Sequence, residues 1–181
     1  MHPPVIVLGY SEAAMLLRTP HDIDVRAIIA IHGQREYPVE TGGVPHALVL
    51  EFDDAEAPHP GDPEHAARLR IRQRQAAEFG LRLSPPTIEH ARQIIEFAES
   101  IRAMDGVLLC QCLAGVSRSA AAALLCLSQW TGPGREDDCV KLLLAVRPCA
   151  SPHPDLVRFG DECLARQGRL VTAMERGLDF C

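Results

Sequence analysis

The segment from Cys112 to Ser119 constrains this chain more than any other. It sets a cysteine, a glycine-containing turn, an arginine and a hydroxyl between an apolar run at 107–109 and a second one at 120–127. The first run predicts a buried strand, and residues 119–130 predict a buried helix. In a tight turn from strand to helix, backbone N–H groups converge near the cysteine sulfur. Unpaired N–H groups and the helix dipole both favour an anion there.

The residue types in this turn predict phosphoryl chemistry. An electropositive turn favours the thiolate, the form of cysteine that attacks, so we take Cys112 as the nucleophile. Arg118 can hold two oxygens of a phosphate with its planar guanidinium group, and Ser119 can donate a hydrogen bond to a leaving thiolate. A structural ion pair for Arg118 and an ordinary first-turn role for Ser119 are the alternatives. The predicted phosphate-binding residues are those of the turn itself: Leu113, Ala114, Gly115, Val116, Ser117 and Arg118.

The order of patterns along the chain predicts the α/β class. Strands are expected at 5–8, 27–31, 47–52 and 107–111, and helices at 11–18, 63–79, 88–101, 119–130, 136–146, 155–167 and 170–176. Strands mixed with helices, followed by helices only, are typical of a small, mostly parallel central sheet flanked by helices. A length of 181 residues suits a single domain over residues 1–181.

Composition limits the classes of binding partner that we expect for this chain. The 18 basic and 24 acidic side chains give a net charge of −6, which disfavours nucleic acid as a partner. No apolar run approaches the roughly 20 residues of a membrane span, so no membrane is expected. Seven cysteines without a C-x-x-C pair favour reduced thiols and a cytoplasmic location. The histidines show no metal-ligand spacing, and neither a metal nor a cofactor is expected.

Residues 112–119 resemble the phosphate loop of cysteine-dependent protein tyrosine phosphatases, especially their dual-specificity branch. That family has a cysteine, five residues, an arginine and then serine or threonine. The five intervening residues here, Leu-Ala-Gly-Val-Ser, are close to those typical of the dual-specificity branch. The segment 146–152, with Arg147-Pro148 and Ser151-Pro152, is similar to the family's Arg- and Pro-containing segment after the helix that follows the loop. The resemblance covers residues 46–53 and 87–165 and implies the family's fold.

The resemblance also implies a general acid, which the family takes from an aspartate after an earlier strand. Asp53 and Asp54 both follow the strand at 47–52. We favour Asp54, because the second aspartate is the acid in relatives with a Phe-Asp-Asp pattern. Both aspartates lie further from Cys112 than is usual, and a helical insert at about 63–86 accounts for the difference. This insert either lies over the site as a lid or decorates the surface.

Two positions depart from the family pattern. Gln111 stands where the family has a histidine that helps to hold the thiolate, and Gln111 has no proton to titrate. His153 stands where the family usually has asparagine, so a charge there varies with pH.

These observations predict hydrolysis of phosphomonoesters, without metal, through a cysteinyl-phosphate intermediate. The first substrate class is phosphotyrosine proteins, with phosphoserine and phosphothreonine as further ones. No lysine occurs at 113–117, whereas relatives that act on inositol phospholipids carry extra basic residues in this loop. Two alternatives stay open: a phosphatase of inositol phosphates or other small molecules on the same fold, and a catalytically weak phosphate-binding module. The predicted partner is therefore a phosphorylated protein or a small phosphomonoester.

Overall fold

The computed structural model describes residues 2–36, 41–59 and 61–178. Four strands form one sheet in the order β1-β4-β2-β3, and each described pairing is parallel. The strands are β1 (Val5–Gly9), β2 (Val25–His32), β3 (His46–Glu51) and β4 (Val107–Cys112). The predicted α/β class is confirmed, and the described sheet is more regular than the mostly parallel one expected.

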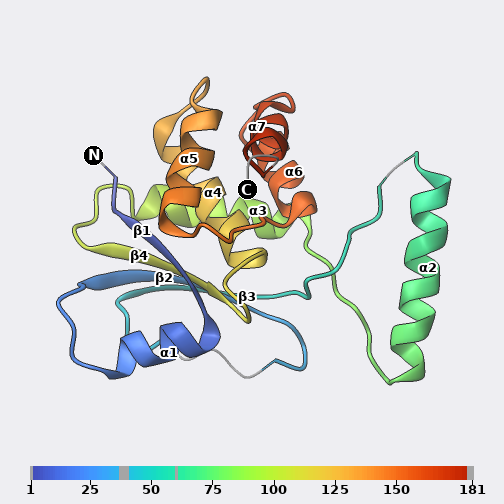
Figure 1. Ribbon diagram of the computed structural model, residues 1–181, viewed down its shortest axis with the longest axis horizontal. Coiled ribbons are helices and arrows are strands. Elements are labelled where there is room, and N and C mark those ends of the chain that lie inside the picture. Colours follow the sequence, from blue (N-terminus) through green and yellow to red (C-terminus); the bar gives the residue numbers. More distant parts are fainter. Residues whose placement is uncertain (1, 37–40, 60, 179–181) are drawn as a thin grey trace.

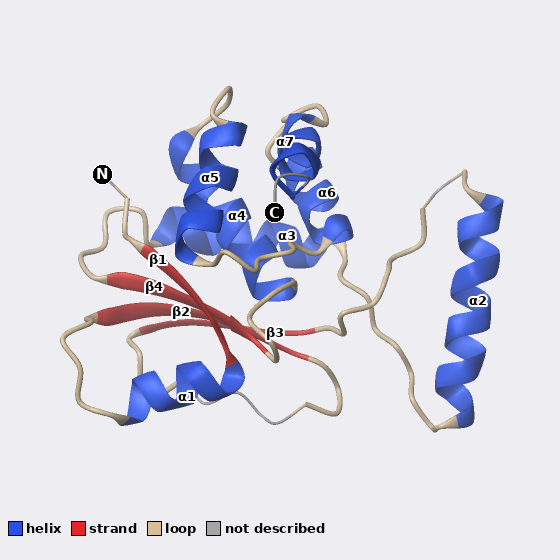
Figure 2. Cartoon of the chain, viewed as in Figure 1, coloured by secondary structure: helices blue, strands red, loops and turns tan. Residues whose placement is uncertain are grey.

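Helices cover both faces of this sheet (Figure 1). Of the helices in the described residues, α1 (Tyr10–Arg18) alone lies on one face. The other carries the remaining helices of the body: α3 (Ile88–Ser100), α4 (Arg118–Thr131), α5 (Glu136–Val146), α6 (Pro154–Cys163) and α7 (Arg169–Leu178). The insert helix α2 (Pro63–Glu78) stands to one side of this body, joined to it by two extended segments (Figure 2).

The alternation of side chains along the strands decides which residues reach the site. In β2, Ile29 and Ile31 enter the large core under α3–α7, while Ile28 packs on the α1 side. The same alternation in β4 directs Cys112 to the large core and places Gln111 on the opposite face. Because β2 and β4 are the two central strands, both of their faces are apolar, which explains their continuous hydrophobic runs.

One helix ends earlier than its pattern predicts. The expectation of a helix over 155–167 is wrong at its end, because α6 stops at Cys163. Ala165 and Gln167 have φ of 53° and 58°, in the left-handed region. The carboxylate of Asp161 accepts the N–H groups of Gly168 (2.6 Å) and Leu170 (2.8 Å), which stabilises this turn before α7. Such a side-chain contact leaves no mark on the hydrophobic pattern.

Among the described helices, none combines the length and the apolarity that crossing a membrane requires. The six described cysteines are all free thiols, and Cys181 lies outside the described residues.

Candidate active site

The backbone of residues 113–117 is held from outside by hydrogen bonds to all five of its carbonyl groups. Two donors belong to one side chain, that of Arg147, and the others are backbone N–H groups. From donor to acceptor, the bonds run from Tyr10 N–H to Leu113 (3.1 Å), Arg147 Nη2 to Ala114 (3.2 Å), Arg147 Nε to Gly115 (3.0 Å), Ser151 N–H to Val116 (2.9 Å) and His153 N–H to Ser117 (3.3 Å).

These bonds determine where the N–H groups of the loop point. In a trans peptide the C=O of one residue and the N–H of the next point in opposite directions, and the described chain has no cis peptide. Since the carbonyls of residues 113–117 point outward, the N–H groups of residues 114–118 point to the inner side of the loop. An inner surface of N–H groups at the start of a helix is an anion-binding surface.

Gly115 allows this loop to lie against the end of β1. Its φ of +69° is in the region that glycine adopts without strain. A Cβ at this position would lie 2.3 Å from the backbone nitrogen of Gly9 and 2.4 Å from the carbonyl carbon of Leu8. Both atoms are backbone, so neither can move aside cheaply.

Cys112 and Ser119 meet at the base of the loop. The distance from Cys112 Sγ to Ser119 Oγ is 3.1 Å, and both residues are buried. Cys112 ends β4, and Ser119 lies in the first turn of α4. The arrangement lets the serine hydroxyl donate to the sulfur when the sulfur carries negative charge.

Arg118 is buried and forms an ion pair with Glu36. Its Nη2 donates to Glu36 Oε1 (2.6 Å), and its Nη1 donates to Glu36 Oε2 (3.0 Å) and to the Phe52 carbonyl (3.1 Å). Burial opposes the charge of Arg118, but Glu36 outweighs it, and Cys112 and Asp54 add to the attraction, so the pKa of Arg118 is raised. Arg118 Nε is buried and finds no partner among the described residues.

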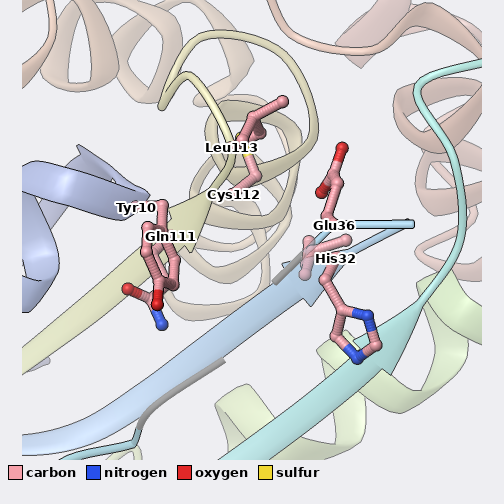
Figure 3. Close-up of a pocket in the computed structure, with 7 residues that line it drawn as sticks. Tyr10, His32, Glu36, Gln111, Cys112 and Leu113 are labelled. Carbon is pink, nitrogen blue, oxygen red and sulfur yellow. The ribbon is translucent and has the colours of Figure 1, made fainter. Parts of the chain in front are cut away.

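Glu36 is a site residue that the sequence does not reveal. It sits in the loop after β2, far along the chain from Arg118, in a stretch without a recognisable motif. Burial works against its charge, but hydrogen bonds from Arg118 and the Gly33 N–H outweigh burial and lower the pKa of Glu36. In Figure 3 its carboxylate lies across the pocket from Cys112 and Leu113. The ion pair fixes the guanidinium of Arg118 at one side of the loop.

The two candidate acids have different surroundings. Asp54 is half exposed; its Oδ1 accepts the Ser117 hydroxyl (2.6 Å) and lies 3.6 Å from His153 Nε2. Asp53 is bound instead to the start of the segment that returns from the insert. Its carboxylate accepts the Ser84 N–H (2.7 Å), and its own N–H donates to the Ser84 carbonyl (2.7 Å). The structure thus brings Asp54 to the phosphate loop and uses Asp53 to hold the chain.

Residues from the start of α6 hold the segment that follows Asp54. The Nε2 of His153 bonds the Ala55 carbonyl (3.1 Å), and since a carbonyl only accepts, this nitrogen carries the proton. The buried Asp155 accepts the Ala57 N–H (2.7 Å) and lies 2.6 Å from His59 Nε2. Burial opposes the charge of Asp155, but these bonds outweigh it and lower the pKa of Asp155. Like Glu36, Asp155 is a residue near the site that no sequence motif indicates.

Gln111 does not take over the task of the histidine that it replaces. Its side chain lies beside Tyr10, on the opposite side of Cys112 from Glu36 in the view of Figure 3. Gln111 Nε2 is buried without a hydrogen-bond partner among the described residues. The amide N–H groups of Gln111 therefore have no described acceptor, in the loop or elsewhere. The strand alternation is the reason, because it sends residue 111 to the α1 side.

The fold is that of dual-specificity phosphatases and their relatives, as comparison with solved structures shows. No protein-family model matches the sequence, and no curated protein matches it. The phosphatase domain of Yvh1 from Chaetomium thermophilum is 19% identical, with a TM-score of 0.58 over 92% of this chain and 93% of that chain.

Two further solved structures are also similar in fold to this chain. A human tyrosine phosphatase-like serine/threonine/tyrosine-interacting protein is 21% identical, with a TM-score of 0.56 over 89% of this chain and 91% of its own. PTPMT1 in complex with PI(5)P is 18% identical, with a TM-score of 0.53 over 91% and 94% of the two chains. The predicted resemblance to cysteine-dependent phosphatases is confirmed for the fold.

Proposed function

We propose that this chain is one phosphatase domain with an inserted helix and that it hydrolyses phosphomonoesters through a cysteinyl-phosphate intermediate. The first substrate class is phosphotyrosine proteins, and phosphoserine and phosphothreonine are further substrates. One observation carries the proposal. The outward hydrogen bonds of the carbonyls of residues 113–117 leave the N–H groups of residues 114–118 facing inward, beside the sulfur of Cys112 and the guanidinium of Arg118. Such preorganised donors stabilise the charge that develops on a transferring phosphoryl group.

In the first step the Cys112 thiolate attacks phosphorus in line with the ester oxygen. An S–P bond forms, the P–O bond breaks, and Asp54 gives its proton to the leaving oxygen. The N–H groups of the loop and Arg118 hold the three non-bridging oxygens. Arg118 can offer its free Nε and the remaining N–H of an Nη already turned toward Glu36.

In the second step water replaces the sulfur. The Asp54 carboxylate takes a proton from the water, whose oxygen attacks phosphorus and releases inorganic phosphate and the thiolate. Ser119, 3.1 Å from the sulfur, donates a hydrogen bond to the departing thiolate. The positive field comes from Arg118 and backbone N–H groups, so no metal is needed in either step.

A phosphate-binding module is the second candidate. It is favoured by the engagement of both Nη atoms of Arg118 with Glu36 and Phe52, and by the unpartnered amide of Gln111. Release of phosphate from para-nitrophenyl phosphate in the presence of a chelator separates the two candidates. A module binds a phosphopeptide without any such release. Rates on a phosphotyrosine peptide and on inositol phosphates, measured side by side, test the substrate class.

Assays of three proteins define the expected outcome. The wild-type protein releases phosphate with a chelator present and is inhibited by vanadate, while Cys112→Ser loses turnover. Arg118→Lys loses most activity, because an ammonium group cannot make the two-pronged contact of a guanidinium. Turnover that survives Cys112→Ser, or that depends on added metal, would contradict the mechanism.

A further inference from the structure

The insert concentrates positive charge on an acidic protein. Residues 63–82 carry five arginines and two glutamates, a net charge of +3, and because the whole chain carries −6 the remainder carries −9. Four of these arginines, residues 68, 70, 72 and 74, are exposed on α2. A local field of this sign attracts acidic ligands to a molecule that otherwise repels them.

The insert is attached to the segment that follows Asp54. His65 and Leu69 are the buried residues of α2. His65 Nε2 donates to the Ala57 carbonyl (3.0 Å), and its ring stacks on that of His59 at 4.2 Å between centroids. At the other end of the insert, Arg35 Nη2 donates to the Gly80 carbonyl (2.8 Å). The position of α2 relative to the proposed acid is therefore set by contacts at both ends.

A pocket of about 130 Å³ lies between α2 and Asp54. Its apolar lining comes from Leu69, Leu83 and Pro85. Arg72 at its edge forms an ion pair with Glu56 at 2.9 Å, with 59% and 39% of the two side chains exposed. An ion pair this exposed contributes little to stability, so another carboxylate can replace Glu56 at small cost.

We propose that this pocket and Arg72 bind an acidic side chain that flanks the phosphorylated residue, so that acidic phosphoprotein segments are the preferred substrates. The inference rests on the proposed function. The carboxylate takes the place of Glu56 on Arg72, and the methylene groups of the side chain lie on the apolar lining. Asp54 lines the same pocket and contacts the phosphate loop through Ser117, so a peptide bound in the loop has its next residues beside the pocket.

The position of the positive charge favours a peptide over an inositol phospholipid. The phosphate loop itself offers no basic side chain other than Arg118. The additional arginines stand on a separate helix to one side of the body (Figure 1). An extended chain can reach both places, whereas the phosphates of a single inositol ring gather around one point.

The geometry of α2 supplies a matched control. At 3.6 residues per turn, Arg72 lies roughly 60° around the helix from the buried Leu69, whereas Arg74 lies roughly 140° away and outside the pocket lining. Arg72→Ala and Arg74→Ala remove the same charge from the same exposed helix. Both replacements introduce a good helix former, so the fold of α2 is kept.

The experiment measures binding in a Cys112→Ser background, where turnover cannot interfere. Fluorescence anisotropy gives the Kd of two phosphotyrosine peptides, one with glutamate on both sides of the phosphotyrosine and one with glutamine there. We expect the glutamate peptide to bind about fivefold more tightly, the upper end of the effect that one partly exposed ion pair produces. Arg72→Ala should remove most of this preference, and Arg74→Ala should keep it.

Glu56→Gln provides the converse test. Removing the internal competitor should tighten binding of the glutamate peptide and leave the glutamine peptide unchanged. Equal loss of preference in Arg72→Ala and Arg74→Ala would mean a general field rather than a binding pocket, and overturns the inference. Recruitment to phosphatidylcholine vesicles containing a phosphoinositide, with no preference between the peptides, overturns it in favour of a lipid.

The two proposals fail in different ways. Turnover of para-nitrophenyl phosphate by the wild-type protein, without a peptide preference, refutes the pocket and keeps the phosphatase. A peptide preference that depends on Arg72, in a protein without turnover, refutes the phosphatase and keeps the pocket as a recognition site.

Discussion

The roles of Asp53 and Asp54 can be separated by exchanging each for asparagine. In Asp54→Asn the amide oxygen can still accept the Ser117 hydroxyl, so the exchange keeps the contact of 2.6 Å and removes the carboxyl group that gives and takes the proton. In Asp53→Asn the amide oxygen can still accept the Ser84 N–H, so this exchange weakens one hydrogen bond at the base of the insert. The two variants lose the same charge at adjacent positions, and each is the control of the other.

The expected magnitudes differ widely. Loss of a general acid lowers the rate by about 10²- to 10⁴-fold, which corresponds to a barrier higher by about 3 to 5 kcal/mol. Weakening the Asp53 bond costs about 1 kcal/mol of stability. We therefore expect Asp54→Asn to lose at least about 100-fold in kcat, and Asp53→Asn to lose less than about tenfold in kcat, with a small fall in the urea midpoint.

The rates of both variants on a series of aryl phosphates with different leaving phenols provide the sharpest test. The deficit of Asp54→Asn should grow as the leaving phenol becomes less acidic, because a poorer leaving group needs its proton more. Asp53→Asn should show no such trend. Equal deficits in the two variants, or a deficit of Asp54→Asn that ignores the leaving group, would refute the assignment.

The remaining predictions concern the loop and the buried charges. Gly115→Ala should lower the free energy of unfolding by at least about 2 kcal/mol and weaken vanadate binding, because its Cβ meets the backbone of β1. Gly134→Ala has a similar φ of +84° but open space at Cβ, and should cost about 1 kcal/mol with vanadate binding unchanged; equal losses in urea titrations would contradict the steric argument. The lowered pKa values of Glu36 and Asp155 mean that the folded state binds fewer protons than the unfolded chain. The stabilisation by these two carboxylates is present above the ordinary carboxyl pKa of about 4 and is lost as pH falls through their lowered pKa values. The urea midpoint of the wild-type protein should therefore drop in this acidic range. The drop should be smaller in Glu36→Gln, which lacks one of the two carboxylates.

Much of this fold follows from local patterns. The runs at 27–31 and 107–111 are apolar at every or nearly every position, which is what strands buried on both faces require, and they are β2 and β4. The helix expected at 136–146 is α5 to the residue. The end of α6 could not be found in this way, because it depends on the hydrogen bonds that Asp161 accepts from N–H groups beyond the helix.

The candidate site likewise has some residues that local patterns predict and others that they do not. Cys112, Ser119 and the loop between them are neighbours in the chain, so their meeting needs only one strand, one turn and one helix. Choosing between Asp53 and Asp54 is different, since adjacent residues share every local pattern. The contacts of Asp54 with Ser117 and of Asp53 with Ser84 distinguish them, and both join segments distant in the chain.

The sequence by itself determined the class of fold and which residues make up the loop, because hydrophobic period and a compact motif act over a few residues. Only the tertiary structure decided which partner holds Arg118, where Gln111 points and what the insert stands beside. Glu36 reaches Arg118 from the loop after β2, the pleat of β4 puts Gln111 on the face opposite Cys112, and buried contacts of His65 set α2 beside Asp54. Each depends on the packing of segments that no local pattern connects.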